Sequence, residues 1–142
     1  MVRAVAAEAR STPDVSIDTS RVDAVRVDGD PATLERMVRN LAENATRHAA
    51  TRVCFSLAEH DAAAILIIDD DGPGIPPGDR DRVFERFVRL DEARARSDGG
   101  AGLGLAVVRA AARSHGGEVR AHASPCGGAR FEVRLPVAGV RA

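Results

Sequence analysis

A glycine-rich stretch in front of an apolar helix constrains this chain more than any other feature. Residues 99–105 read Gly-Gly-Ala-Gly-Leu-Gly-Leu, and an alanine-rich apolar run follows as far as Ala112. The positions without side chains, Gly100, Gly102 and Gly104, let a ligand approach backbone N–H groups at the positive end of a helix dipole. A polyanion such as a nucleotide triphosphate suits this position. A simple turn or linker would carry the same glycines, so the stretch alone leaves both interpretations open.

The composition excludes several classes of protein. The 142 residues, 44% of them hydrophobic, suffice for one domain with a real core. With 3% aromatic residues and a net charge of −1, the chain offers neither stacking platforms nor a basic surface, so we expect no nucleic-acid partner. Cys54 and Cys126 lack CxxC spacing, which indicates reduced thiols in the cytosol. The apolar run 62–68 is too short for a bilayer, so we expect this fragment not to be inserted in a membrane.

The hydrophobic pattern predicts one domain of mixed helices and strands, which we place at residues 14–142 after a lead-in at 1–13. Asp30 and Pro31 suit the start of a helix, and apolar residues from Leu34 to Ala45 recur at helical spacing. The other predicted elements are short β-like runs at 15–17 and 24–27, strands at 52–57 and 63–69, a helical turn at 81–87, a mobile charged loop at 89–99, a helix at 103–114, and strands at 118–122 and 129–135.

Two asparagines lie one turn apart on the first long helix. Asn40 and Asn44 share a face at the edge of the apolar stripe, and Arg47 and His48 extend this polar margin. Solvated polar residues would give the same pattern. Near a phosphate loop, however, two neutral oxygen ligands suit Mg²⁺, which takes few protein ligands and completes its shell with phosphate and water.

An acidic segment follows the most apolar strand directly. The segment begins with Asp69, Asp70 and Asp71. An acidic residue at a strand end can accept a hydrogen bond from an amine such as the adenine amino group, while Gly72 and Gly74 let a flat base approach the backbone. A calcium loop is disfavoured, because Pro73 interrupts the pattern and Arg80 stands where a glutamate is required. A plain Asp-Gly turn remains the alternative.

Four segments resemble, in order and spacing, the sequence boxes of bacterial two-component sensor histidine kinases. They are Asn-Leu-Ala-Glu-Asn-Ala at 40–45, Asp-Asp-Gly-Pro-Gly-Ile at 70–75, Val-Phe-Glu-Arg-Phe at 83–87 and Gly-Ala-Gly-Leu-Gly-Leu at 100–105, with 127–131 resembling a weaker last glycine box. The resemblance implies the catalytic ATP-binding domain of the GHKL superfamily. This fold is an α+β two-layer sandwich, in which about three helices cover one face of a mixed β-sheet.

The resemblance also implies a role for each matching residue. Asn44 and Asn40 would hold Mg²⁺, and together with Arg47 they would form the catalytic set. Asp70 would recognise adenine, and the loop at 89–99 would be the ATP lid, anchored by Phe84 and Phe87. The remaining nucleotide-binding positions would be Arg47 and His48 near the phosphate tail, Gly72, Gly74 and Ile75 around the base, and Gly100, Gly102, Leu103, Gly104 and Leu105 over the phosphates.

The expected function is to bind MgATP and donate its γ-phosphate to a histidine on a separate dimerisation domain, with a response regulator downstream. Asn40 stands where ATP-hydrolysing relatives carry a glutamate that activates water, so we expect slow hydrolysis. Ala129 replaces a threonine common in the last glycine box, which predicts modest affinity. No histidine here has the setting of a phosphoacceptor, so the isolated chain is expected not to phosphorylate itself.

The resemblance further implies a homodimeric parent in the plasma membrane, of which this chain would be a monomeric cytoplasmic domain. Three other functions stay open. A serine kinase of the anti-sigma-factor type shares the fold, although the phenylalanine box and the long lid argue against it. A non-catalytic nucleotide-binding module would show a disrupted metal site, whereas Asn44 is present. A true ATPase is disfavoured by Asn40.

Overall fold

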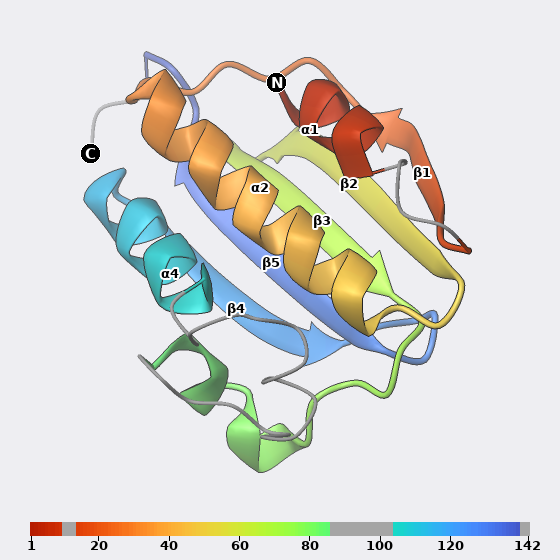
Figure 1. Cartoon of the computed structure of the whole chain (residues 1–142). Coiled ribbons are helices and arrows are strands. Elements are labelled where there is room, and N and C mark those ends of the chain that lie inside the picture. The colour runs from red at the N-terminus through yellow and green to blue at the C-terminus, as the bar shows by residue number, and fades with distance from the viewer. Residues whose placement is uncertain (10–13, 86–103, 140–142) are drawn as a thin grey trace.

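The computed structural model describes residues 1–9, 14–85 and 104–139, and it has two layers (Figure 1). A five-stranded sheet with strand order β1-β2-β3-β5-β4 forms one layer. Helices α1, α2 and α4 lie together on one face of it, which confirms the predicted α+β sandwich (Figure 1). The helices and strands are α1 (Val2–Ala9), β1 (Ser16–Val22), α2 (Pro31–His48), β2 (Arg52–His60), β3 (Ala63–Asp70), α4 (Gly104–Ser114), β4 (Glu118–Ala123) and β5 (Ala129–Pro136).

The sheet is mixed, as expected. β1 runs parallel to β2, and the other neighbours are antiparallel. Alternate residues of β5 are buried, because successive side chains of a strand point to opposite faces and only one face carries helices. The register pairs Asp69 at the end of β3 with Arg130 near the start of β5. The four predicted strands from 52 to 135 are confirmed, and β2 extends as far as His60.

Helix α2 begins and buries its side chains as the sequence predicts. Asp30 is the N-cap, its carboxylate accepts the N–H of Thr33, and Pro31 occupies the first helical position. The apolar stripe is buried against the sheet and the other helices, and it consists of Leu34, Met37, Val38, Leu41, Ala42 and Ala45. The polar margin with the two asparagines therefore lies at the edge of this core.

The N-terminal region differs from expectation in two ways. Residues 2–9, expected within a lead-in, form helix α1, which packs Val5 and Ala6 into the core. One strand, β1, begins within the first of the two short β-like runs, whereas the second run, 24–27, is not a strand. The sequence hid this strand because residues 18–21 are all polar, and the register of β1 against β2 shifts between Asp18 and Arg21.

Short helical turns follow β3. These are η1 (Pro77–Asp79) and η2 (Arg82–Phe84), and the latter lies within the predicted helical turn at 81–87. The predicted loop at 89–99 lies outside the described residues. Within the described ranges, the structure has no helix of the length and hydropathy needed to cross a membrane.

Candidate functional site

A buried carboxylate stands at the end of the central strand β3. Asp70 is 2% exposed, and its Oδ1 accepts the backbone N–H of Gly72 at 2.9 Å and that of Ala129 at 3.2 Å. Burial raises the pKa of Asp70, while these two donors and the nearby His48 act in the opposite direction. Both of these hydrogen bonds are accepted by Oδ1. The other carboxylate oxygen, Oδ2, can therefore accept a hydrogen bond from a ligand.

Two glycines let the backbone close around this carboxylate. A Cβ at Gly128 would lie 2.3 Å from Asp70 Oδ1, and one at Gly72 would lie 2.1 Å from the carbonyl oxygen of His48. Gly74 has a φ of +77°, a conformation that side chains rarely allow. These positions favour glycine because the end of β3, the start of β5, the loop after β3 and the end of α2 meet here. Gly72 and Gly74, predicted only to let a base approach the backbone, thus also have a structural role.

The predicted metal ligands lie at the edge of α2. Asn40 and Asn44 are both partly exposed, and Asn40 Nδ2 donates to the carbonyl oxygen of Gly104 over 3.4 Å. This contact brings α2 next to the start of α4, as the sequence analysis requires for a metal and phosphate site. It also orients the Asn40 amide, because the nitrogen rather than the oxygen must face a carbonyl.

The end of α2 lies beside the acidic segment. His48 is partly buried and close enough to Asp70 to lower the pKa of that carboxyl, while its carbonyl oxygen packs against Gly72. Arg47, on the same turn, is exposed. The structure therefore brings His48 to the Asp70 end of the site, and Asn40 to the start of α4.

Only some of the other predicted site residues lie within the described part of the chain. Ile75 and Leu105 are partly buried and pack against the core. Phe84 is buried in an edge-to-face contact with Phe131, with ring centroids 5.9 Å apart, and the guanidinium carbon of Arg109 lies 4.9 Å from its centroid. The predicted positions Phe87, Gly100, Gly102 and Leu103 lie outside the described residues.

Sequence reasoning missed the role of Asp71. Its Oδ1 accepts the N–H groups of Ala50, Thr51 and Arg52 at 2.9 to 3.0 Å, and its Oδ2 accepts the Thr51 hydroxyl. These bonds, with the Thr51 hydroxyl foremost, hold the pKa of Asp71 far below its usual range. Asp71 thus fastens the loop after α2 to the end of β3. A run of three aspartates offers no signal that distinguishes this one.

Sequence reasoning also missed an ion pair beneath the site. Asp69 and Arg130 form two hydrogen bonds, at 2.8 and 2.9 Å, on the face of the sheet that carries no helices. The pair raises the pKa of Arg130 and joins β3 to β5 where Asp70 and Ala129 meet. Only the strand register reveals it.

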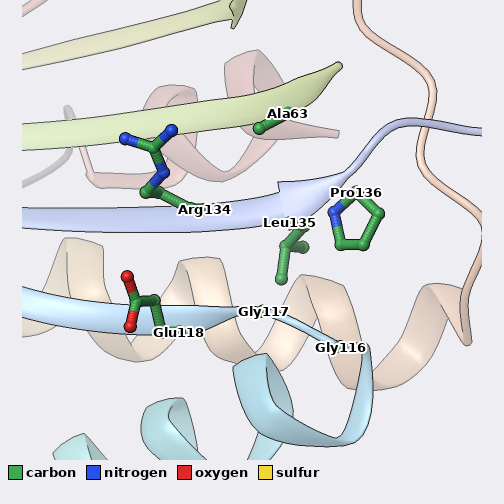
Figure 2. A pocket seen from close by; sticks show the side chains of 7 residues that line it. All are labelled: Ala63, Gly116, Gly117, Glu118, Arg134, Leu135 and Pro136. Atoms are coloured by element: carbon green, nitrogen blue, oxygen red, sulfur yellow. The ribbon is translucent and has the colours of Figure 1, made fainter. Parts of the chain in front are cut away.

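A shallow pocket of about 350 Å³ lies at the other end of the sheet (Figure 2). It is formed where β3 starts and β5 ends, whereas Asp70 stands where β3 ends. Its lining consists of Ala63, Gly116, Gly117, Glu118, Arg134, Leu135 and Pro136. None of these residues was predicted to bind the nucleotide, so the pocket is separate from the candidate site.

Comparisons with known proteins agree with this arrangement. The sequence model of the family described as histidine kinase-, DNA gyrase B-, and HSP90-like ATPase matches residues 29–139. The sensor histidine kinase CpxA of Escherichia coli strain K12 is 43% identical over 109 residues, which cover 77% of this chain and 24% of CpxA. The chain thus spans about a quarter of that relative's length.

Solved structures are similar over nearly the whole chain. The mycobacterial sensor histidine kinase MprB superposes with a TM-score of 0.85 at 36% identity, covering 96% of this chain and 93% of that one. The ATP binding domain of PrrB from Mycobacterium tuberculosis superposes with a TM-score of 0.78 at 37% identity, covering 96% of this chain and 90% of the other.

Proposed function

The chain belongs to the family of histidine kinase-, DNA gyrase B- and HSP90-like ATPases, and we propose that it is the module of a two-component sensor that binds MgATP and donates the γ-phosphate to a histidine on a separate domain. One observation carries the proposal. Helix α2 contacts both halves of the proposed site, since Asn40 bonds to Gly104 at the start of α4 and the His48 carbonyl at the end of α2 lies against Gly72, two residues after the buried Asp70.

Asp70 is suited to recognise adenine. Its Oδ2 would accept the exocyclic amino group, and Gly72 and Gly74 would let the base approach the backbone while Ile75 contacts its face. A carboxylate accepts hydrogen bonds but donates none when ionised, so it favours a base with an amino group at this position. The name of the similar PrrB structure, an ATP binding domain, supports the choice of adenine nucleotide.

The residues around Asn44 fit a magnesium ion. Because Asn40 Nδ2 donates to the carbonyl oxygen of Gly104, Oδ1 is the atom of this amide that could bind a cation. Asn44 and Asn40 would hold Mg²⁺, with Arg47 and His48 near the phosphate tail. When bound, the ion neutralises charge on the β- and γ-phosphates. The start of α4 at Gly104 and Leu105, with Gly100, Gly102 and Leu103 before it, would face the same phosphates.

The transfer itself asks little covalent chemistry of this chain. An imidazole nitrogen of the acceptor would supply the electron pair for the new bond to the γ-phosphorus, while the bond to the bridging oxygen breaks and ADP leaves. The chain positions the nucleotide and balances its charge, and Arg47 is the cation proposed for that role. Asn40 has no basicity with which to activate water, so the γ-phosphate is kept for the acceptor.

The partners of this module follow from the same proposal. The acceptor would be a dimerisation domain of the parent kinase, and the phosphoryl group would pass on to a response regulator. The parent would be a homodimeric membrane sensor, with this domain on the cytoplasmic side. The names of the relatives, sensor histidine kinases, favour a histidine acceptor over a serine acceptor.

Equilibrium binding of ATP tests the metal assignment. Asn44→Ala should lose most of the gain in ATP affinity that Mg²⁺ gives to the unaltered chain, by about tenfold or more, because an amide ligand is removed. Glu43→Ala is the matched control, since Glu43 is the neighbouring residue and is exposed. Isothermal titration of each protein with ATP, in Mg²⁺ and in EDTA, measures the effect. Equal Mg²⁺ dependence in Asn44→Ala and the unaltered chain would remove the metal assignment.

A further inference from the structure

The two helices proposed to carry the metal and phosphate groups are hydrogen-bonded to one another at both ends of α4. Near the middle of α2, Asn40 Nδ2 donates to the Gly104 carbonyl at the start of α4 over 3.4 Å. At the other end, the backbone N–H of Asp30 donates to Nε2 of His115 over 3.1 Å. The helices lie side by side and antiparallel on the sheet (Figure 1).

His115 supplies an acceptor that α2 does not supply for itself. The first N–H groups of a helix have no partner within the helix. The Asp30 carboxylate accepts the N–H of Thr33, which is half of a capping box. The other half needs Glu or Gln at the position of Thr33, to accept the N–H of the capping residue. The Thr33 hydroxyl instead donates to the Asp30 carboxylate, and the imidazole ring takes the place of the missing acceptor.

The partners of the imidazole ring fix its protonation. Nδ1 lies 2.8 Å from the carbonyl oxygen of Ala111, which can only accept, so Nδ1 carries the proton. Nε2 faces the N–H of Asp30, which can only donate, so Nε2 is bare. One ring nitrogen therefore donates a hydrogen bond to α4, and the other accepts one from the N-terminal cap of α2.

Glycines on both sides hold the ring in this position. A Cβ at Gly29 would lie 2.3 Å from Cδ2 of His115, so a side chain at position 29 would displace the ring. Gly116 has a φ of +77° and donates to the Arg113 carbonyl, while Gly117 donates to that of Ala112. These two hydrogen bonds form a Schellman motif, which terminates α4 and makes His115 its C-cap. The C-cap residue of one helix thus completes the N-cap of the other.

We propose that His115 is a positioning residue for the nucleotide site: its bond to the N-cap of α2 sets the register of α2 against α4, and so places Asn40 and Asn44 relative to Gly104. The proposal rests on the proposed function, since it assigns these helices to phosphate and metal. The adenine half of the site, with Asp70, stands on the sheet and is held by its own hydrogen bonds. Loss of the tie therefore weakens MgATP binding selectively.

Two substitutions separate the two nitrogens of the ring. In His115→Asn the amide can reach the position of Nδ1 but not that of Nε2, whereas in His115→Gln it can reach that of Nε2. We expect His115→Asn to bind MgATP about fivefold more weakly, as for loss of one hydrogen bond, and to bind AMP in EDTA with unchanged affinity. His115→Gln should bind both nucleotides as the unaltered chain does. Hydrogen exchange at the Asp30 amide should accelerate in His115→Asn only.

The control is His60→Asn, an exposed position at the end of β2. Unchanged MgATP affinity in His115→Asn would overturn the proposal. So would equal losses for MgATP and AMP, because a merely destabilised domain would lose both. Failure of the unaltered chain to bind MgATP would contradict the proposed function instead, and exchange at the Asp30 amide would still report whether the tie exists.

Discussion

The backbone N–H of Ala129 donates to Oδ1 of Asp70 over 3.2 Å and so fixes the carboxylate from a strand 59 positions away in sequence. The donor belongs to the backbone, so this bond does not depend on the side chain at position 129. The carboxylate is thereby oriented at the junction of β3 and β5, although its burial raises its pKa. Burial destabilises the ionised form of Asp70, and a ligand that donates a hydrogen bond to the carboxylate would offset this loss of solvation.

Asp70→Asn is expected to separate stability from binding. Because burial raises the folded-state pKa of Asp70, its ionisation opposes folding: the stability it contributes is present at low pH and is lost as pH rises. The variant should therefore be at least as stable as the unaltered chain at pH 7, while its ATP affinity falls by about tenfold or more. Urea unfolding and isothermal titration measure the two quantities.

The same reasoning predicts how ATP binding depends on pH. The ionised carboxylate is a stronger acceptor for the adenine amino group than the neutral acid, so affinity should fall as pH is lowered through the raised pKa of Asp70. Protonation of the ATP phosphates affects both proteins equally, so the difference in ATP affinity between the unaltered chain and Asp70→Asn isolates the effect of Asp70. A difference in ATP affinity that stays constant as pH is lowered from neutral to about 4, the ordinary pKa of a carboxyl, would contradict the role given to Asp70.

Gly72→Ala should damage the fold at the site, whereas Gly78→Ala should not. The new Cβ at 72 would lie 2.1 Å from the His48 carbonyl, and a backbone atom cannot move aside cheaply, while nothing lies within 4 Å of a Cβ at 78. We expect Gly72→Ala to lose about 1–3 kcal/mol of unfolding free energy. Urea unfolding of both variants measures this. Equal stability of the two would show that the end of α2 does not pack on this loop.

Helix α2 shows how far the sequence predicts this structure. Its apolar stripe, its cap at Asp30 and the asparagine edge follow from local spacing, and all are confirmed. The acidic segment stands out for a similar reason, since it follows an apolar run, and only the family resemblance singles out Asp70 within it. Helix α1 was missed because eight residues rich in alanine carry little periodic signal, and its stability comes from packing Val5 and Ala6 in the core.

Contacts between distant strands and helices could not be predicted in this way. The pair of Asp69 and Arg130 depends on the register of β3 and β5, and the tie of Asp30 to His115 depends on how two helices pack. No local sequence pattern indicates either contact. The assignment of the predicted metal and phosphate positions came from the resemblance of ordered segments, and it stays a prediction.

Asp71→Asn should reduce stability at neutral pH and weaken the response to acid. The folded-state pKa of Asp71 is depressed, so its stabilising contribution is complete above the unfolded-state pKa of about 3.9 and is lost as pH falls below it. The unaltered chain should therefore lose more unfolding free energy than Asp71→Asn between about pH 5 and pH 2. Asp23→Asn, at an exposed position, is the control. Parallel losses in all three proteins would contradict the role of Asp71.

The most direct test of the account is phosphoryl transfer in trans. The chain is incubated with Mg²⁺ and γ-labelled ATP, alone and together with the dimerisation domain of its parent kinase. The account predicts acid-labile, base-stable label on the dimerisation domain only, and none there when the chain carries Asn44→Ala. Label on the isolated chain, acid-stable label on the partner, or release of free phosphate without transfer would contradict the proposal that this domain donates the γ-phosphate to a histidine on another domain.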